Sequence, residues 1–143
     1  MLIDGVRNDH SLSHNENIRI SIITVVYNNA LHIRETIESV LTQGCLAIEY
    51  VVIDGGSTDR TIDIILEYRD QISVFVSEPD NGIYDAMNKG VGLSSGDYVA
   101  FLNSGDYYTD GKLALIADAL SSEHPDLLYG DLDYIDDKHI VKR

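Results

Sequence analysis

The alternation of apolar runs with amphipathic stretches predicts a domain of alternating strands and helices after residue 17. Four apolar runs rich in β-branched residues lie at 18–28, 48–54, 72–77 and 97–103, as expected for strands covered on both faces. A fifth strand is predicted at 126–130. The sequence "YIDDKHIVKR" that ends the chain is typical of a hairpin or an edge strand.

Between these runs, apolar residues recur at the spacing of one helix face. This pattern predicts helices at about 30–42, 59–69, 82–93 and 110–120. Asn28 or Asn29 is expected to cap the first helix, and Ser57 or Thr58 the second. The order of strands and helices indicates an α/β fold, a Rossmann-like three-layer αβα sandwich with a mainly parallel sheet.

Polar residues follow each of the first four predicted strands. They occupy 27–29, 54–59, 78–81 and 103–106. Open α/β sheets bind ligands at the carboxyl ends of their strands. We therefore expect the functional site at this edge of the sheet.

Two common ligand sites fit the sequence poorly. A dinucleotide fingerprint should follow the first strand, where the chain reads "YNNA", and "GVGLSSG" at 90–96 precedes a strand and has the wrong final spacing. The acidic segment "DLDYIDD" lacks the Gly and the terminal Glu of a calcium loop, so a solvated acidic turn is expected there. The five His residues form no metal-binding pattern.

Length and charge limit the class of ligand. The chain has 143 residues, enough for one domain with a hydrophobic core, and its 10 basic and 24 acidic residues give a net charge of −14. This charge excludes a nucleic-acid surface and disfavours simple docking to anionic lipid. An anionic ligand would need a metal ion or backbone N–H groups.

Cysteine usage and the N-terminal residues suggest a cytoplasmic protein. Cys45 is the single cysteine, which rules out an intramolecular disulfide and suits a reducing compartment. No run reaches the ~18 apolar residues of a membrane span. Residues 1–17 form a polar lead-in without the apolar core of a signal peptide, and residues 18–143 form the expected domain.

Three segments together resemble the family 2 glycosyltransferases, which have the GT-A fold. They are "ISIITVVYNNALHIRETIESVLTQ", "EYVVIDGGSTDRT" and "GIYDAMNKG…GDYVAFLNSGD", which fall in order between Arg19 and Asp106. The resemblance implies transfer of a hexose from a nucleotide-diphosphate sugar to a saccharide or lipid-linked acceptor in cell-surface polysaccharide synthesis. It also implies inversion at the anomeric carbon and a divalent metal, Mn2+ or Mg2+, as cofactor.

The resemblance further implies how the nucleotide is bound. Thr24, Val26 and Tyr27 at the end of the first strand would hold the base, with Tyr27 stacked on it. Asp54 would accept a hydrogen bond from a base N–H. The family often has two Asp residues at this turn, whereas this chain has Asp54 followed by Gly55, which is also expected to line the donor site.

The segment after the third strand would meet the diphosphate. It matches the family at Asn81, Gly82 and Asn88. The family's common Arg before Asn88 is replaced by Met87, so positive charge would have to come from Lys89 or from the metal, with Asp85 orienting Lys89.

The family's metal motif, Asp-x-Asp or Asp-x-Asp-Asp, reads Asn103-Ser104-Gly105-Asp106 in this chain. Asp106 is the one carboxylate retained, and it would hold the metal together with water and two phosphate oxygens. Asn103 and Ser104 would contact the donor. Gly105 would allow the backbone to approach the phosphates.

The family's general base would lie beyond residue 143, so no catalytic residue is assigned, and the acidic residues of 131–137 are not taken as the base. The chain is therefore expected to be a truncated domain that holds the donor-binding half. A nucleotide-sugar-binding or interaction module without catalysis is the alternative. Homo-oligomer formation and peripheral membrane association through further segments stay open.

Overall fold

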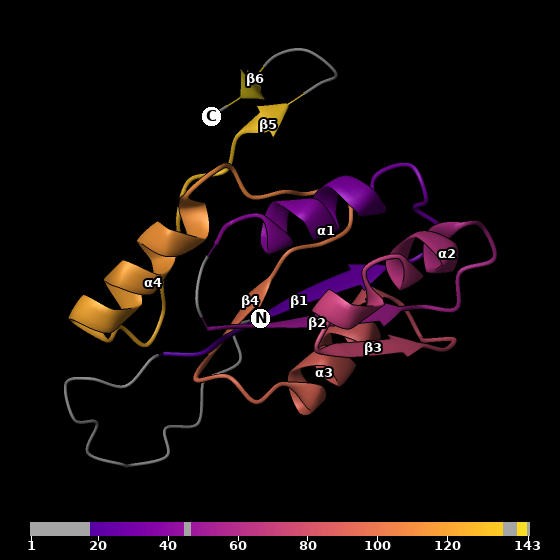
Figure 1. Cartoon of the computed structure of the whole chain (residues 1–143), viewed down its shortest axis with the longest axis horizontal. Helices are drawn as coiled ribbons and strands as arrows, with labels where there is room; N and C mark the ends of the chain where they lie inside the picture. The colour runs from indigo at the N-terminus through magenta and orange to yellow at the C-terminus, as the bar shows by residue number, and fades with distance from the viewer. Residues whose placement is uncertain (1–17, 45–46, 136–139, 143) are drawn as a thin grey trace.

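The computed structural model describes residues 18–44, 47–135 and 140–142 and contains a parallel sheet of four strands in the order β3-β2-β1-β4 (Figure 1). The strands are β1 (Ile20–Val26), β2 (Ile48–Asp54), β3 (Val74–Ser77) and β4 (Tyr98–Phe101). The four apolar runs therefore form strands, and the predicted α/β class with a parallel sheet is confirmed. The predicted lead-in 1–17 and Cys45 lie outside the described residues.

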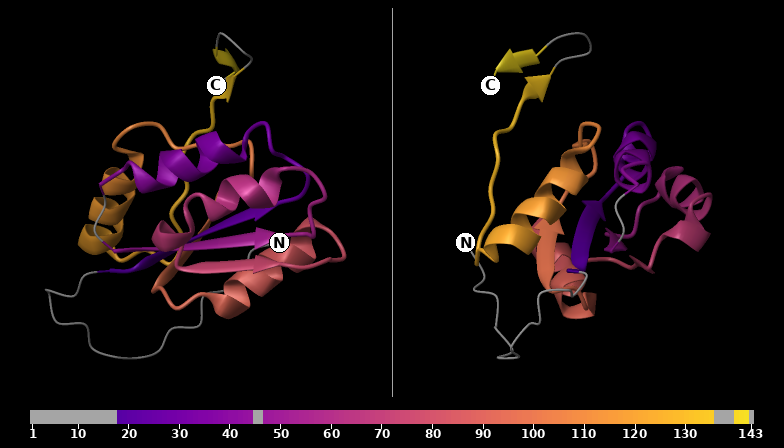
Figure 2. Two further views of the ribbon diagram at one scale, coloured as in Figure 1. Left: turned by 45° about the vertical axis from the view of Figure 1, so that its right-hand side comes forward. Right: turned by 60° about the vertical axis from the view of Figure 1, so that its left-hand side comes forward.

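Helices cover both faces of the sheet (Figure 2). One face carries α1 (Ile33–Leu41) and α2 (Thr61–Leu66), the other carries α3 (Ile83–Leu93), and α4 (Lys112–Glu123) packs into the same core as α1. Side chains of β1 alternate, so Ile22 and Val26 join the core under α1 and α2 while Ile23 and Val25 join the core under α3. No helix in the described part of the chain is long and apolar enough to cross a bilayer.

The strand ends are in register at one edge of the sheet. Val26 pairs with Asp54, which pairs with Ser77. β4 ends earlier, but the chain continues along β1 until the Ser104 N–H donates to the Val25 carbonyl at 3.1 Å. The loops after all four strands consequently open on the same edge.

The predicted helix caps are wrong at both helices. α1 begins after His32 without a side-chain cap. The Asn28 side chain instead accepts the N–H groups of Thr58 at 2.7 Å and Asp59 at 3.3 Å. α2 also has no side-chain cap and ends at Leu66; the short 3-10 turn η1 (Arg69–Gln71) follows. Asn28 thus joins two loops of the sheet edge, a role that a local helix pattern cannot show.

The predicted strand at 126–130 is absent, and the chain there is irregular. Leu127 is 56% and Tyr129 89% exposed, so these side chains have no layer to pack against. The segment leads instead to a hairpin of β5 (Tyr134–Ile135) and β6 (Ile140–Lys142), which stands apart from the sheet (Figure 2). A hairpin or an edge strand was predicted for this end of the chain, and the structure has the hairpin. Apolar composition alone misled at 126–130, because a strand also needs a neighbour to pair with.

A buried carboxylate fastens the opposite, amino edge of the sheet. Glu49 of β2 is 4% exposed and accepts hydrogen bonds from the Ser21 hydroxyl at 2.5 Å and from the Ser95 N–H and hydroxyl at 2.7 Å each. Burial alone would raise the pKa of Glu49, but the hydrogen bonds from Ser21 and Ser95 and the charge of Arg19 lower it to about 2. This network attaches the loop between α3 and β4 to the sheet.

Candidate functional site

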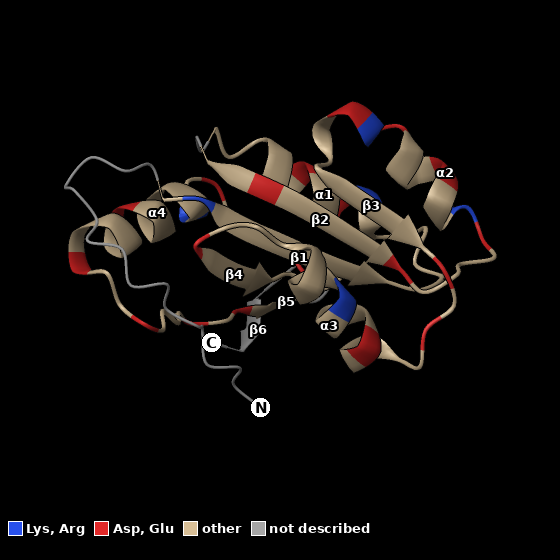
Figure 3. Cartoon of the chain, turned by 90° about the horizontal axis from the view of Figure 1, so that it is seen from below, with Lys and Arg blue, Asp and Glu red and all other residues tan. Residues whose placement is uncertain are grey.

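The loops at the carboxyl ends of the strands form a polar and acidic edge. We call this edge the rim and define it as residues 27–29, 54–59, 78–82 and 103–106. Figure 3 shows Asp and Glu at the end of β2 and on the loop that follows β3. The rim lies where open α/β sheets bind ligands, as predicted.

Asp54 organises the turn after β2. It is fully buried, and its Oδ2 accepts the N–H groups of Gly56 at 3.1 Å and Ser57 at 2.9 Å and the hydroxyl of Ser77 at 2.7 Å. Its Oδ1 accepts the Ser57 hydroxyl. Both oxygens are therefore committed to the protein. No face of the Asp54 carboxylate is exposed in this arrangement, and its contact with a base stays a prediction.

A second carboxylate lies over this turn. Asp80, from the loop after β3, is half-buried, and its Oδ1 accepts the Gly82 N–H at 2.8 Å. A Cβ atom placed on Gly55 would lie 2.5 Å from Asp80 Oδ2, so a side chain at position 55 would occupy the space that this oxygen takes. The sequence analysis did not single out Asp80. The replacement of a family Asp by Gly55 was the available signal.

The end of β1 offers one exposed side chain to the rim. Tyr27 is 62% exposed and follows Val26, whose carbonyl accepts the Gly55 N–H at 2.9 Å. Thr24 is fully buried, and its hydroxyl lies 3.1 Å from that of Tyr50 in the core. The side chains of Thr24 and Val26 are thus buried, and the predicted contacts of Thr24, Val26 and Tyr27 with a base stay predictions.

The start of α3 is a hydrogen-bonded loop. The Asn81 N–H donates to Asp85 Oδ2 at 3.0 Å, and its side-chain amide lies 3.4 Å from the same oxygen. Asn88 is exposed on α3, and Met87 packs against the core beneath that helix. The predicted donor residues Asn81, Gly82 and Asn88 therefore lie on one exposed segment, while Met87 points away from it.

The ammonium group of Lys89 forms ion pairs with carboxylates of the protein, so it is not free to bind a phosphate. Its Nζ lies 2.9 Å from Glu78 and 3.7 Å from Asp85. The hydrogen bond to Glu78 raises the pKa of Lys89, and the charges of Glu78, Asp85 and Asp80 add to this effect. Asp85 does contact Lys89, as expected, but the positive charge is already balanced within the protein.

Residues 103–106 form a tight turn beside the end of β1. The Asp106 N–H donates to the Asn103 carbonyl at 2.9 Å, and Gly105, third in the turn, has φ +102°, a conformation that side chains other than Gly rarely adopt. Asp106 is exposed. Asn103 Oδ1 is buried and has no hydrogen-bond partner among the described residues. A buried acceptor in this situation calls for a donor or a cation.

Helix α1 holds this turn in place. The buried Thr36 hydroxyl accepts the Gly105 N–H at 3.0 Å and donates to the Asp106 carbonyl at 2.9 Å. The Asn29 amide donates to the carbonyl and hydroxyl of Ser104 at 3.2 and 2.9 Å. The position of the Asp106 loop is thus set by side chains about 70 residues earlier in the chain.

The same face of α1 holds the rest of the loop. Ser39 accepts the Tyr108 N–H at 3.2 Å, and Gln43 donates to the Thr109 carbonyl at 3.1 Å and accepts the Leu113 N–H at 3.3 Å. The sequence analysis missed these residues. The signal was present, because positions 29, 36, 39 and 43 recur at helical spacing.

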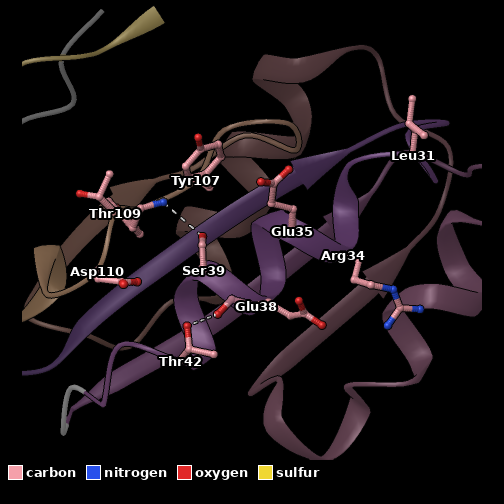
Figure 4. Close-up of a pocket in the computed structure, with 10 residues that line it drawn as sticks. Leu31, Arg34, Glu35, Glu38, Ser39, Thr42, Tyr107, Thr109 and Asp110 are labelled. Atoms are coloured by element: carbon pink, nitrogen blue, oxygen red, sulfur yellow. Dashed lines mark hydrogen bonds between the residues drawn. The ribbon is translucent and has the colours of Figure 1, made fainter. Parts of the chain in front are cut away.

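A groove of about 680 Å3 lies on the outer side of α1, beside residues 107–110 (Figure 4). Its charged lining comprises Glu35, Glu38, Asp110 and Arg34. Arg34 donates to Glu67 at 2.6 Å and to the Tyr68 hydroxyl at 2.7 Å. The one basic side chain of this lining is thus already bonded within the protein, and the groove lies away from the carboxyl ends of the strands, where open α/β sheets bind ligands.

Sequence comparison identifies the protein family to which this chain belongs. The profile of glycosyl transferase family 2 matches residues 21–142, and the chain belongs to this family. It is 37% identical over 117 residues to the PGL/p-HBAD biosynthesis glycosyltransferase of Mycobacterium tuberculosis, a match that covers 78% of this chain and 46% of that protein. The chain thus spans about half the length of the curated relatives that it matches in this way.

Solved structures agree with the fold. S. aureus TarS 1–349 in complex with UDP-GlcNAc superposes with a TM-score of 0.68 at 27% identity, covering 75% of this chain and 32% of that one. The mannosyltransferase PcManGT from Pyrobaculum calidifontis, in complex with GDP-Man and Mn2+, gives 0.65 at 22% identity, with 79% of this chain and 34% of that one covered. The predicted GT-A fold is thereby confirmed.

Proposed function

We propose that the rim binds a nucleotide-diphosphate sugar with a divalent metal, and that the protein transfers the sugar, with inversion, to a saccharide or lipid-linked acceptor. The observation that carries this proposal is the turn at residues 103–106. It combines the exposed carboxylate of Asp106 with the unpartnered Oδ1 of Asn103, and α1 fixes its backbone. The family and the nucleotide-bound TarS structure support it.

The turn offers oxygen atoms that suit Mn2+ or Mg2+. A hard cation of this kind takes carboxylate and amide oxygens and completes its shell with water and phosphate oxygens. The described residues contain no group of three acidic, His or Cys side chains that could bind a metal without a ligand. Asp106 would hold the ion with help from Asn103, and the bound ion would neutralise charge on the leaving diphosphate.

The charge distribution favours this use of a metal. The chain carries a net charge of −14, and Lys89 is already paired with Glu78 and Asp85. A diphosphate arriving at the rim would therefore meet little uncompensated positive charge from side chains. A divalent cation and the backbone N–H groups of the rim supply the missing attraction. Tyr27 would stack on the base and orient the nucleotide.

Binding without transfer is the second candidate. Two departures from the family's pattern favour it: Met87, in place of a common Arg, packs against the core, and Gly105 stands where the metal motif has a carboxylate. Transfer of sugar to an acceptor, measured beside nucleotide binding, would distinguish the two candidates.

The metal site can be tested by calorimetry with UDP and GDP, with and without Mn2+. We expect Asp106→Asn to lose about 10- to 100-fold of the Mn2+-dependent affinity, because it removes the charged ligand of the ion. Asp110→Asn, an exposed Asp in the same loop, is the matched control and should bind as the wild type does. Unchanged metal dependence in Asp106→Asn, or no nucleotide binding by the wild type with Mn2+, would contradict the proposal.

A further inference from the structure

We infer that Asp80, and not Asp54, reads the nucleobase, and that it selects a base with a single imide N–H, such as uracil or thymine. This inference rests on the proposed function of the rim as a nucleotide site. It begins from the state of Asp54, whose two oxygens accept four hydrogen bonds from Gly56, Ser57 and Ser77 within the protein. Asp54 is fully buried, so a base cannot approach its carboxylate without opening the turn.

Asp80 has the accessibility that Asp54 lacks. It is half-buried, its Oδ1 accepts the Gly82 N–H at 2.8 Å, and its Oδ2 accepts no hydrogen bond from the described residues. Gly55 provides the space, because a Cβ atom there would lie 2.5 Å from Oδ2 and 3.2 Å from Cγ of Asp80. The Asp80 carboxylate therefore occupies the space into which a side chain at position 55 would extend.

Neighbouring strand ends place this oxygen beside a stacking surface. Tyr27 follows β1, Gly55 follows β2 and Asp80 lies on the loop after β3, and these three strands are adjacent in the sheet. The Gly55 N–H is bound to the Val26 carbonyl at 2.9 Å, which fixes the turn next to Tyr27. A base stacked on Tyr27 would thus present its edge toward Asp80.

The hydrogen bonding of Asp80 restricts the base. Guanine offers two adjacent donors, N1–H and N2–H, that pair best with both oxygens of a carboxylate. Here Oδ1 is used by Gly82, and Oδ2 is the oxygen left for the ligand. One acceptor suits the N3–H of uracil or thymine. Cytosine has an unprotonated N3 at that position, so it would have to shift in the plane of the ring to bring its N4 amino group to Oδ2.

The test is the preference between UDP and CDP, measured by calorimetry on the 143-residue chain with Mn2+. Asp80→Asn keeps the shape, and its amide oxygen can still accept the Gly82 N–H, but a donor replaces the oxygen Oδ2. Loss of a charge-assisted hydrogen bond predicts about 10- to 100-fold weaker UDP binding and a shift of preference toward CDP. Asp118→Asn, an exposed Asp on α4, is the control and should leave the preference unchanged.

A second variant, Gly55→Asp combined with Asp80→Ala, removes the side chain that fills this space and returns a carboxylate to it from the neighbouring strand end. We expect it to recover the preference for UDP. A UDP-to-CDP ratio that does not change in Asp80→Asn, or a wild type that prefers GDP or CDP, would overturn the inference while leaving the proposed function intact. If the wild type binds none of these nucleotides with Mn2+, the proposed function fails and the inference falls with it.

Discussion

Replacing Asp54 tests whether this carboxylate serves stability or ligand binding. In Asp54→Ala, four donors lose their acceptor: the Gly56 and Ser57 N–H groups and the Ser57 and Ser77 hydroxyls. The hydroxyls can rotate toward other acceptors, but the two N–H groups cannot. A stranded donor costs about 1–3 kcal/mol, so we expect unfolding to become about 3–5 kcal/mol easier. Total stabilities of small domains are about 5–15 kcal/mol, which makes this a large loss.

Asp54→Asn should be milder. Its remaining oxygen can take the position of Oδ2 and keep three of the bonds, while its amide can donate to the Ser57 hydroxyl, so a cost of about 1–2 kcal/mol is expected. Urea unfolding followed by circular dichroism measures both values, with Asp118→Ala as a surface control expected within about 0.5 kcal/mol of the wild type. The reasoning is refuted if Asp54→Ala unfolds within about 1 kcal/mol of the wild type yet loses nucleotide affinity.

Two further predictions concern the opposite edge of the sheet and the Asp106 loop. The pKa of Glu49 is lowered to about 2 in the fold, so its contribution to the free energy of unfolding, up to about 3 kcal/mol, should be complete above pH 4.5 and disappear as the pH falls toward 2. Glu49→Gln should therefore differ from the wild type at pH 7 and converge with it near pH 2; a constant difference would contradict this. Thr36→Val strands the Gly105 N–H and the Asp106 carbonyl, so we expect about 1–3 kcal/mol of destabilisation and weaker Mn2+-dependent UDP binding. Thr42→Val, which loses a hydroxyl bonded within its own helix, is the control, and equal UDP binding by Thr36→Val and Thr42→Val would count against the role of Thr36.

The apolar periodicity predicted the elements well because both faces of the sheet are buried. Ile22 and Ile23 face opposite cores and are equally inaccessible, so β1 appears in the sequence as a continuous apolar run. The same rule failed at 126–130, where apolar residues are exposed and no strand forms. Composition alone does not tell whether a pairing partner is present.

The arrangement of the rim could be predicted from the sequence, but most of the contacts within it could not. Strand ends located the rim, and the family's motif located the turn that ends at Asp106. The roles of Asp54 and Asp80 depend on which carboxylate the surrounding N–H groups reach, and that is set by contacts between β2, β3 and their loops. Likewise, Thr36 contacts Gly105 across 69 residues of sequence, a relation that no local pattern contains.

Thr36 and Asn29 also limit how parts of this fold can be exchanged between relatives. Apart from the bond between the Asp106 N–H and the Asn103 carbonyl, the loop that carries Asp106 is held by side chains on α1 and on the segment before it. A chimera that receives residues 103–113 from another protein, but keeps a foreign helix at 29–43, would carry the proposed metal ligand without the side chains that position it. The two segments behave as one inherited unit, and a functional exchange between glycosyltransferases of this kind would have to move both together.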